Sequence, residues 1–304
     1  MNTPRDRLFS IVIPAFNYGH YLARAMESVL AQSGDDYELI VVDDGSSDHT
    51  ADVVKSYQNG ASLVTYIFQQ NRGLAAARNL GVQMSKAEYL LFLDADDALL
   101  PSALGSFRSV VGSHRTLDFV LAGRIVVSSN GRVKEVASEP LSALRDKNFM
   151  SFLRSIPLAI VNGSNIVHRR IFERLSFPES VRLWEDRVFY AQLLALYSGS
   201  SIADPVVTIY RHDDSLSHNV NLIKRDGHKT VDLLFDPAVL PSHLMSFRSE
   251  YEAVTQRMLF DVLYDSGLYQ EAVEVFGKMM RQSPKQAFTV RHVRRYLKMR
   301  LALL

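Results

Sequence analysis

One short stretch constrains the fold of this chain more than any other. Five apolar or aromatic residues, Tyr89 to Leu93, run directly into three acids at Asp94, Asp96 and Asp97. A continuous apolar run of this length indicates a strand buried on both faces, as in the middle of a parallel sheet. Open α/β sheets bind their ligands at the carboxyl ends of such strands. The stretch therefore predicts a ligand site where this strand ends.

The three acids admit two interpretations. Crowded carboxylates repel one another unless a cation or a polar ligand neutralises them. Hard divalent cations such as Mg²⁺ or Mn²⁺ bind oxygen ligands, and they usually bridge to phosphate oxygens as well. The first interpretation is thus a metal and phosphate site at Asp94, Asp96 and Asp97. The second is a solvated acidic turn without a ligand, and this stretch alone does not separate the two.

The first two-thirds of the chain alternate strand and helix patterns. Strands are predicted at Phe9 to Pro14, Tyr37 to Val42, Leu63 to Phe68, Tyr89 to Leu93, Leu117 to Ala122 and Ile202 to Tyr210. Helices are predicted at Tyr18 to Gln32, Thr50 to Gln58, Gly73 to Ser85, after Pro101, at Arg169 to Leu175 and from Trp184 to about Tyr197. The Asn130-Gly131 pair predicts a hairpin. This alternation predicts an α/β fold with βαβ units, right-handed connections and a mostly parallel sheet.

From about Val220 the strand patterns stop and only helices are predicted. Ser249 to Asp265 and Tyr269 to Met280 form a helix pair joined by a short turn. We therefore expect two domains, residues 1–219 with the α/β fold and residues 220–304 with helices alone.

The end of the chain has a distinctive charge pattern. After Lys278 it contains no acid, but it holds Arg281, Lys285, Arg291, Arg294, Arg295, Lys298 and Arg300 among apolar residues. A basic helix with an apolar stripe suits the surface of an anionic membrane. The same pattern fits an amphipathic helix that packs on the protein itself, and both interpretations remain open.

Composition excludes several classes of protein. The 304 residues carry a formal net charge of +1, so no overall field favours nucleic acid as a partner. The chain has no cysteine, which excludes disulfides and thiolate metal sites and is typical of a reducing compartment. The N-terminal residues lack a signal-peptide pattern, and no run approaches the roughly 18 apolar residues of a membrane span. We expect a cytoplasmic protein.

Four segments together resemble the family 2 glycosyltransferases. They are Ser10-Ile11-Val12-Ile13-Pro14-Ala15-Phe16-Asn17, Val41-Val42-Asp43-Asp44-Gly45-Ser46-Ser47-Asp48, Asn71-Arg72-Gly73-Leu74-Ala75-Ala76-Ala77-Arg78-Asn79 and Leu93-Asp94-Ala95-Asp96-Asp97. They occur in the order and spacing of that family, and the resemblance covers about residues 8–218. It implies the GT-A fold, a nucleotide-sugar donor, a divalent cation (Mn²⁺ or Mg²⁺) and transfer with inversion.

The resemblance also implies which residues bind the nucleotide sugar. The matching positions are Pro14, Ala15 and Phe16 along the base and ribose, Asp44 at the uracil imide, Arg72 and Arg78 near the nucleotide, and Asp94 with Ala95 near the ribose. Two of them have structural alternatives. Asp44 also belongs to a good turn sequence, Asp-Asp-Gly-Ser, and Arg78 could serve as a cap or a bridge.

Further matches concern the cation and the base. Asp96 matches the metal ligand of the family's Asp-X-Asp motif, and His212 matches a late histidine that reaches the metal or the diphosphate. The segment around His212 is one residue shorter than the common pattern. Asn162-Gly163-Ser164-Asn165 lies where the family lines its acceptor or diphosphate pocket.

Asp186 matches the aspartate that takes the proton of the acceptor hydroxyl, with Glu185 in support. The alternative is an acidic pair favoured by a helix N-terminus. Trp184, just before the pair, is suited either to stacking on a sugar ring or to the core.

The resulting hypothesis is transfer of a single sugar, favouring a UDP-linked donor, to a hydroxyl of a glycan or glycolipid acceptor. Lipopolysaccharide, capsule or exopolysaccharide assembly at the inner face of the cytoplasmic membrane would suit the basic tail. The lack of a Gln-X-X-Arg-Trp segment argues against a processive synthase. Two rivals are a nucleotidyltransferase, which would favour a glycine-rich phosphate loop near the N-terminus, and a non-catalytic adaptor that binds partners through its C-terminal helices.

Overall fold

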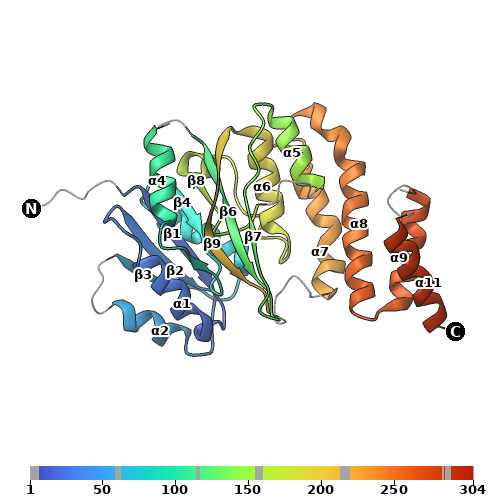
Figure 1. Ribbon diagram of the computed structural model, residues 1–304, viewed down its shortest axis with the longest axis horizontal. Coiled ribbons are helices and arrows are strands. Elements are labelled where there is room, and N and C mark those ends of the chain that lie inside the picture. Colours follow the sequence, from blue (N-terminus) through green and yellow to red (C-terminus); the bar gives the residue numbers. More distant parts are fainter. Residues whose placement is uncertain are drawn as a thin grey trace, which may run out of the picture. The chain divides into compact units, whose positions relative to one another are not determined.

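The computed structural model describes residues 7–58, 63–113, 117–154, 160–212, 220–282, 284 and 289–303. The chain forms two compact units (Figure 1). The first comprises Met1–Ser180 and Phe189–His212, and the second comprises Val181–Val188 and Asp213–Leu304. The domain boundary expected after residue 219 lies at the edge of the described ranges and stays a prediction.

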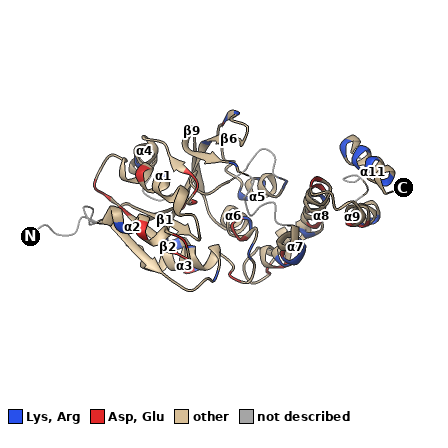
Figure 2. Ribbon diagram, turned by 90° about the horizontal axis from the view of Figure 1, so that it is seen from below, with Lys and Arg blue, Asp and Glu red and all other residues tan. Residues whose placement is uncertain are grey.

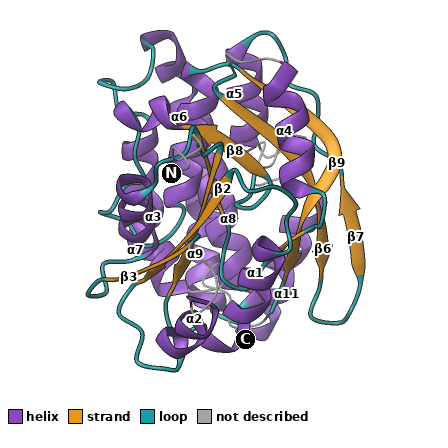
Figure 3. Ribbon diagram, turned by 90° about the vertical axis from the view of Figure 1, so that its left-hand side faces the viewer, coloured by secondary structure: helices purple, strands orange, loops and turns teal. Residues whose placement is uncertain are grey.

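The first unit is built on one mixed sheet (Figure 3). Its strands are β1 (Phe9–Ala15), β2 (Tyr37–Asp43), β3 (Val64–Phe68), β4 (Tyr89–Phe92), β5 (Ala98–Leu99), β6 (Phe119–Val127), β7 (Val133–Val136), β8 (Asn165–His168) and β9 (Gly199–Tyr210). They lie in the order β3-β2-β1-β4-β8-β6-β9-β5, and β7 pairs with β6. Parallel pairs join β3 to β2, β2 to β1, β1 to β4 and β6 to β9. Antiparallel pairs join β8 to both β4 and β6, β5 to β9 and β7 to β6. The predicted α/β fold is confirmed.

Helices connect these strands. They are α1 (Gly19–Leu30), α2 (Thr50–Gln58), α3 (Leu74–Met84), α4 (Ala103–Ser113), α5 (Arg145–Arg154), the 3₁₀ helix η1 (Arg169–Glu173) and α6 (Glu185–Leu196). The sequence did not predict β5 or α5. Strand β5 has only two residues. Helix α5 begins with a polar turn, and its apolar side chains occur only in its second half, so the helical pattern is short.

The first strand does not end at its proline, as the sequence predicted, but continues to Ala15. The carbonyl oxygen of Val12 accepts the N–H of Leu93, so alternate residues of β1 face β4. Pro14 faces the same side, where the pairing with β4 has already ended at Phe92. The missing N–H of Pro14 therefore costs no ladder hydrogen bond, which is how a central strand accommodates it.

Gly81 allows α3 to pack closely against β1. A Cβ atom at this position would overlap Val12 Cγ1 and lie 3.1 Å from Val12 Cγ2. We expect Gly81→Ala to lower the free energy of unfolding by about 1–3 kcal/mol, because overpacking forces neighbouring side chains or backbone to shift. Urea denaturation measures the effect.

Gly105→Ala in α4 is the matched control, because a Cβ atom there meets no atom within 4 Å. It should leave stability unchanged or raise it by up to about 1 kcal/mol, since alanine favours a helix interior over glycine. Equal stabilities of the two variants would contradict the close packing of α3 on β1.

The second unit is helical in its described part. It contains α7 (Val220–Leu234), the 3₁₀ helix η3 (Ser242–Phe247), α8 (Arg248–Asp265), α9 (Tyr269–Gln282) and α11 (Val290–Ala302). The predicted helix pair is confirmed as α8 and α9, with Gly267 between them at a φ of +72°. Their core contains Phe260, Leu263, Ala272, Phe276, Met279 and Met299. None of the helices in the described ranges has both the length and the apolar character needed to cross a membrane.

Candidate functional site

Polar loops gather at the carboxyl edge of the parallel strands, as the sequence predicted. Asp44 follows β2 and Asp94 follows β4, while Phe16 follows β1, which pairs with both strands. Because the three strands run parallel, their last residues bring these positions to one edge of the sheet.

The loop after β1 is locked to the loop after β2. The N–H of Asn17 donates to Ser46 Oγ at 2.9 Å, and Asn17 Oδ1 accepts the N–H of Ser47 at 2.8 Å. Asn17 has a φ of +56°, a conformation that asparagine tolerates better than most residues. These contacts fix the backbone next to Phe16, whose side chain is 42% exposed, whereas Ala15 is buried. Phe16 thus presents a ring at the edge where we predicted a base and ribose.

Asp44 has a structural role that the sequence did not reveal. Its carboxylate accepts hydrogen bonds from Gln69 Nε2 at 2.6 Å, Arg72 N at 2.8 Å and Gly73 N at 2.7 Å. It therefore fastens the loop that leads into α3. A carboxylate can accept about four hydrogen bonds, so the contacts made by described residues leave one acceptor position, on Oδ2. Binding of the uracil imide at that position stays a prediction.

The two predicted nucleotide-binding arginines differ in exposure. Arg72 is exposed, and its guanidinium pairs with Glu179 at 2.7 Å. The Arg78 side chain is 2% exposed, and its Nη2 lies 3.0 Å from Asp94 Oδ1. Arg78 therefore bridges α3 to the acidic turn, which was the structural alternative. Its charge also lies beside a carboxylate that we predicted to bind the ribose.

A second group orients Asp94. Asn162 Nδ2 lies 3.3 Å from both carboxylate oxygens of Asp94. Asn162 Oδ1 accepts the hydroxyl of Tyr190 at 2.9 Å, and Tyr190 in turn accepts Asn165 Nδ2 at 3.1 Å. Asn162 and Asn165 belong to the segment in which the resemblance suggested a pocket lining, and Asn162 is now joined directly to the acidic turn.

Asp96 and His212 are in direct contact. His212 Nε2 lies 2.6 Å from Asp96 Oδ2, although the two residues are far apart in sequence. Burial raises the pKa of Asp96, the negative charge of Asp94 raises it further, and the contact with His212 opposes both effects. The two residues predicted to bind a cation are therefore brought together.

The remaining residues of the acidic turn face the protein. Asp97 is buried, and its Oδ1 accepts the N–H of Tyr210 at 3.0 Å. Burial raises its pKa well above the usual range, with further contributions from the charges of Asp94 and Asp96. Asp97 thus attaches the turn to β9, and Ala95 packs in the hydrophobic core.

Asp96 and His212 have donor atoms that suit a divalent cation. Two donors bound at right angles to one cation, each at about 2.1 Å, lie about 3.0 Å apart. The observed 2.6 Å contact would therefore need to open by only a few tenths of an ångström. In the part of the chain that the structure describes, no three His, Cys, Asp or Glu side chains already surround one point. Phosphate oxygens and water would complete the coordination, as is usual for Mg²⁺.

Three residues that the sequence analysis missed support this pair. The Arg24 guanidinium of α1 lies 3.7 Å from the centre of the Tyr210 ring and donates to the carbonyl oxygen of Asp96. The Tyr21 ring stacks on the His212 ring, with centroids 5.1 Å apart. The one available signal was the three-residue spacing of Tyr21 and Arg24, which places both on one face of α1.

Glu185 and Asp186 lie in the first turn of α6, in the second unit. Glu185 is buried, and Asp186 Oδ1 accepts the N–H of Arg187 at 2.7 Å. Trp184, directly before them, has a φ of +62°. A bulky residue in the left-handed region costs about 1–3 kcal/mol, and such strain concentrates at functional sites.

Helix α7 holds the segment that contains this acidic pair. Asp226 is fully buried, and its carboxylate accepts the N–H of Arg182 at 2.7 Å. The Arg225 guanidinium also donates to it, through Nε at 2.7 Å and Nη2 at 2.8 Å. A Cβ atom on Gly227 would lie 3.6 Å from the Trp184 ring, so the indole packs close to α7.

We expect Asp226→Ala to lower the free energy of unfolding by about 2–4 kcal/mol, because it leaves the N–H of Arg182 without its charged acceptor. Arg225 lowers the pKa of Asp226. This stabilisation is therefore present above the unfolded-state pKa of about 4 and is lost as the pH falls through the folded-state pKa. Urea denaturation at neutral and acidic pH measures both effects.

Asp232→Ala is the control, since Asp232 is exposed and its pair with Arg248 should contribute under about 1 kcal/mol. Similar losses in the two variants would contradict this role of Asp226.

Comparisons with known proteins agree with this arrangement. The family model described as "Glycosyl transferase family 2" matches residues 10–176. The chain is 40% identical over 229 residues to the poly(ribitol-phosphate) beta-N-acetylglucosaminyltransferase TarP of Staphylococcus aureus, which is 72% of this chain and 68% of TarP. It is 41% identical over 112 residues to an uncharacterized glycosyltransferase of Nostoc, which is 36% of this chain and 34% of that protein.

Solved structures share the fold. S. aureus TarS 1-349 in complex with UDP-GlcNAc superposes with a TM-score of 0.69 at 18% identity, covering 92% of this chain and 82% of that one. The predicted GT-A fold is confirmed. Across the first curated relatives, by contrast, the chain spans only 26% to 61% of their length. The family model covers more than half of the chain and contains all four segments that suggested the resemblance, so the protein belongs to glycosyl transferase family 2.

Proposed function

We propose that the protein moves one sugar from a UDP-linked donor to a hydroxyl of a bacterial surface glycan or glycolipid, with inversion at the anomeric carbon. The observation that carries the proposal is the cluster of Asp94, Asp96, His212 and Arg78 at the carboxyl edge of the sheet. The similarity to TarP and the TarS complex with UDP-GlcNAc make UDP-GlcNAc the first donor to test and a polyol-phosphate polymer the first acceptor.

The donor would lie along the sheet edge. Phe16 would pack on the base, the free acceptor position of Asp44 would take the uracil imide, and Asp94 would bind the ribose. Asn162 and Arg78 support this assignment of Asp94, because both contact its carboxylate and so fix its orientation. Arg72 would exchange its exposed partner Glu179 for the diphosphate, which a planar guanidinium binds well.

Asp96 and His212 would hold a divalent cation, Mn²⁺ or Mg²⁺. When bound, such a cation neutralises the charge that develops on the leaving diphosphate. Arg24 would keep the Asp96 backbone in place through its hydrogen bond to the carbonyl oxygen. The chain's own contribution here is to hold the two ligand atoms, Asp96 Oδ2 and His212 Nε2, close together before the nucleotide sugar binds.

Asp186 would act as the base. The acceptor oxygen forms a bond to the anomeric carbon as the bond from that carbon to the phosphate oxygen breaks, and UDP leaves with the electron pair. The hydroxyl proton passes to the Asp186 carboxylate. Glu185, which is buried in the same turn, would position this carboxylate or contact the acceptor. We also propose that the enzyme acts at the inner face of the cytoplasmic membrane, where such glycans are assembled.

Incubation with UDP-GlcNAc and poly(ribitol phosphate), in the presence of Mn²⁺, tests the proposal. We expect release of UDP together with a glycosylated polymer whose new linkage has the β configuration by NMR, inverted from the donor. UDP-glucose, UDP-galactose and GDP-mannose, offered with other glycan acceptors, widen the test. In a separate incubation with UTP and a sugar 1-phosphate, release of pyrophosphate would instead favour a nucleotidyltransferase, whereas donor binding without turnover on any acceptor would favour an adaptor.

A further inference from the structure

Helix α11 packs on its own unit with one face only. Its inner face buries His292 and Met299 and lies against α9. Its outer face exposes large apolar side chains: Val290 is 75% exposed, Leu297 55% and Leu301 73%. These three positions are seven and four residues apart, so they fall on one side of the helix. The sequence left open whether this helix packs on the protein or faces a membrane, and the structure leaves an apolar stripe uncovered by any described residue.

The basic residues of α11 divide into two groups. Arg295 lies 2.7 Å from Asp261 and 2.9 Å from Asp265, and Arg291 lies 3.6 Å from Asp261. These two neutralise acids of α8. Arg294 and Lys298 form no ion pair within the described residues, and they lie at exposed positions of the helix.

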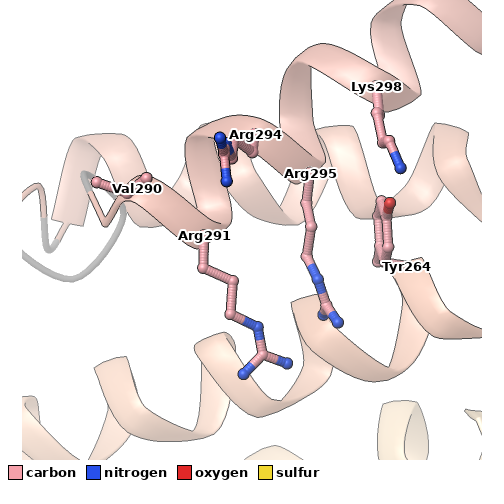
Figure 4. Close-up of a pocket in the computed structure, with 6 residues that line it drawn as sticks. All are labelled: Tyr264, Val290, Arg291, Arg294, Arg295 and Lys298. Atoms are coloured by element: carbon pink, nitrogen blue, oxygen red, sulfur yellow. The ribbon is translucent and has the colours of Figure 1, made fainter.

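The basic residues also line a hollow. Arg291, Arg294, Arg295 and Lys298 surround it together with Val290 and Tyr264, and its volume is about 740 Å³. Figure 4 shows four basic side chains along one helix, with Lys298 pointing toward the Tyr264 ring. Figure 2 shows the same helix as a concentration of positive charge. Among the described residues, Arg294 and Lys298 are the two lining cations without an ion pair, and they suit an anion with several oxygens, such as a phosphate group.

We propose that the outer face of α11 docks on an anionic phospholipid bilayer. Arg294 and Lys298 bind headgroup phosphates, and Val290, Leu297 and Leu301 enter the boundary between headgroups and acyl chains. Three features favour a lipid surface over a soluble polyanion or a second protein. The helix has no acidic residue, its apolar and basic residues are adjacent on one face, and the stripe is one helix wide.

Sedimentation of the full chain with lipid vesicles tests this proposal without any donor or acceptor. We expect binding to phosphatidylcholine vesicles that contain phosphatidylglycerol, weaker binding at high salt and little binding to pure phosphatidylcholine. Each basic residue near an anionic surface contributes about fivefold in affinity. Arg294→Glu with Lys298→Glu should therefore weaken binding about 30-fold or more.

The control reverses two exposed lysines on other helices of the same unit, Lys229→Glu with Lys278→Glu. It changes the net charge equally but should leave vesicle binding within about twofold. A second pair, Leu297→Ser with Leu301→Ser, should weaken binding to the vesicles at least tenfold while leaving the melting temperature unchanged, because both side chains are exposed.

Several outcomes would overturn the proposal. Equal binding to neutral and anionic vesicles would exclude headgroup recognition. Loss of binding in the control pair as well would mean that net charge alone is responsible. If the leucine pair retained full binding while inorganic phosphate or poly(ribitol phosphate) competed with the vesicles, the hollow would be a soluble-phosphate site. If the leucine pair instead abolished self-association seen by analytical ultracentrifugation, the stripe would be an interface with a second copy.

Discussion

Asp186→Asn should reduce the rate of sugar transfer by about 10²–10⁴-fold while leaving UDP affinity within about twofold of the parent value. A positioned general base contributes a factor of this size, because the acceptor hydroxyl is a poor nucleophile until its proton is removed. Asparagine retains an oxygen that can accept the N–H of Arg187, as Asp186 Oδ1 does at 2.7 Å, so the first turn of α6 should keep its local contact. Measured kcat values, together with calorimetric UDP binding, separate the loss of chemistry from a loss of donor binding.

Asp52→Asn is the matched control for this substitution. Asp52 also lies in the first turn of a helix, α2, and its side chain is 79% exposed. Its variant should retain full activity. An Asp186→Asn enzyme that turned over within threefold of the parent would exclude Asp186 as the base and leave the acidic pair with a structural role at the helix N-terminus.

Asp96→Ala should remove the dependence of donor binding on the cation. The substitution deletes the carboxylate in contact with His212 Nε2 and leaves the imidazole alone to bind the metal. A bound cation stabilises the transition state by several kcal/mol, because it neutralises the charge on the leaving diphosphate. Without the cation, kcat/KM should fall at least about 100-fold. In calorimetry, UDP should bind the variant with the same weak affinity whether or not Mn²⁺ is present.

His212→Gln refines this test, because it removes the imidazole ligand but keeps a polar side chain. We expect a smaller loss of Mn²⁺-dependent UDP binding than in Asp96→Ala. An Asp96→Ala enzyme that turned over donor at the parent rate would contradict the assignment of this cluster as the cation site, and an unaltered Mn²⁺ response would do so independently of activity.

The sequence predicted the edge of the sheet where the site lies, because strand ends and acidic turns are local patterns. The run from Tyr89 to Leu93 ends in carboxylates within a few residues, and parallel strands bring such ends together. Resemblance to the family added His212, which no local pattern connects to Asp96. The structure brings them into contact because β9 carries the chain back to the acidic turn, where Asp97 accepts the N–H of Tyr210.

Other contacts could not be predicted, since they depend on which elements become neighbours. Arg24 is one polar position in an ordinary amphipathic helix, and its contacts with Tyr210 and Asp96 arise only once the fold brings its side chain to the acidic turn and to the end of β9. The three hydrogen bonds that occupy Asp44 likewise need the loop before α3 to fold back onto β2. Pro14 shows the opposite error. The rule that a proline ends a strand placed the end of β1 too early, because the rule does not consider that the neighbouring strand β4 has already ended beside Pro14.

Calorimetric titration of the full chain with UDP, GDP and dTDP, each with and without Mn²⁺, tests whether this protein binds a nucleotide-sugar donor at its cation site. A ligand that fits the cluster of Asp94, Asp96 and His212 should bind one site and gain affinity from the cation. We expect measurable UDP binding that Mn²⁺ strengthens at least tenfold, with weaker binding of the other two nucleotides. A preference for GDP or dTDP would retain the cation site and change the donor. Failure of all three nucleotides to bind, with Mn²⁺ present, would contradict a nucleotide-sugar transferase.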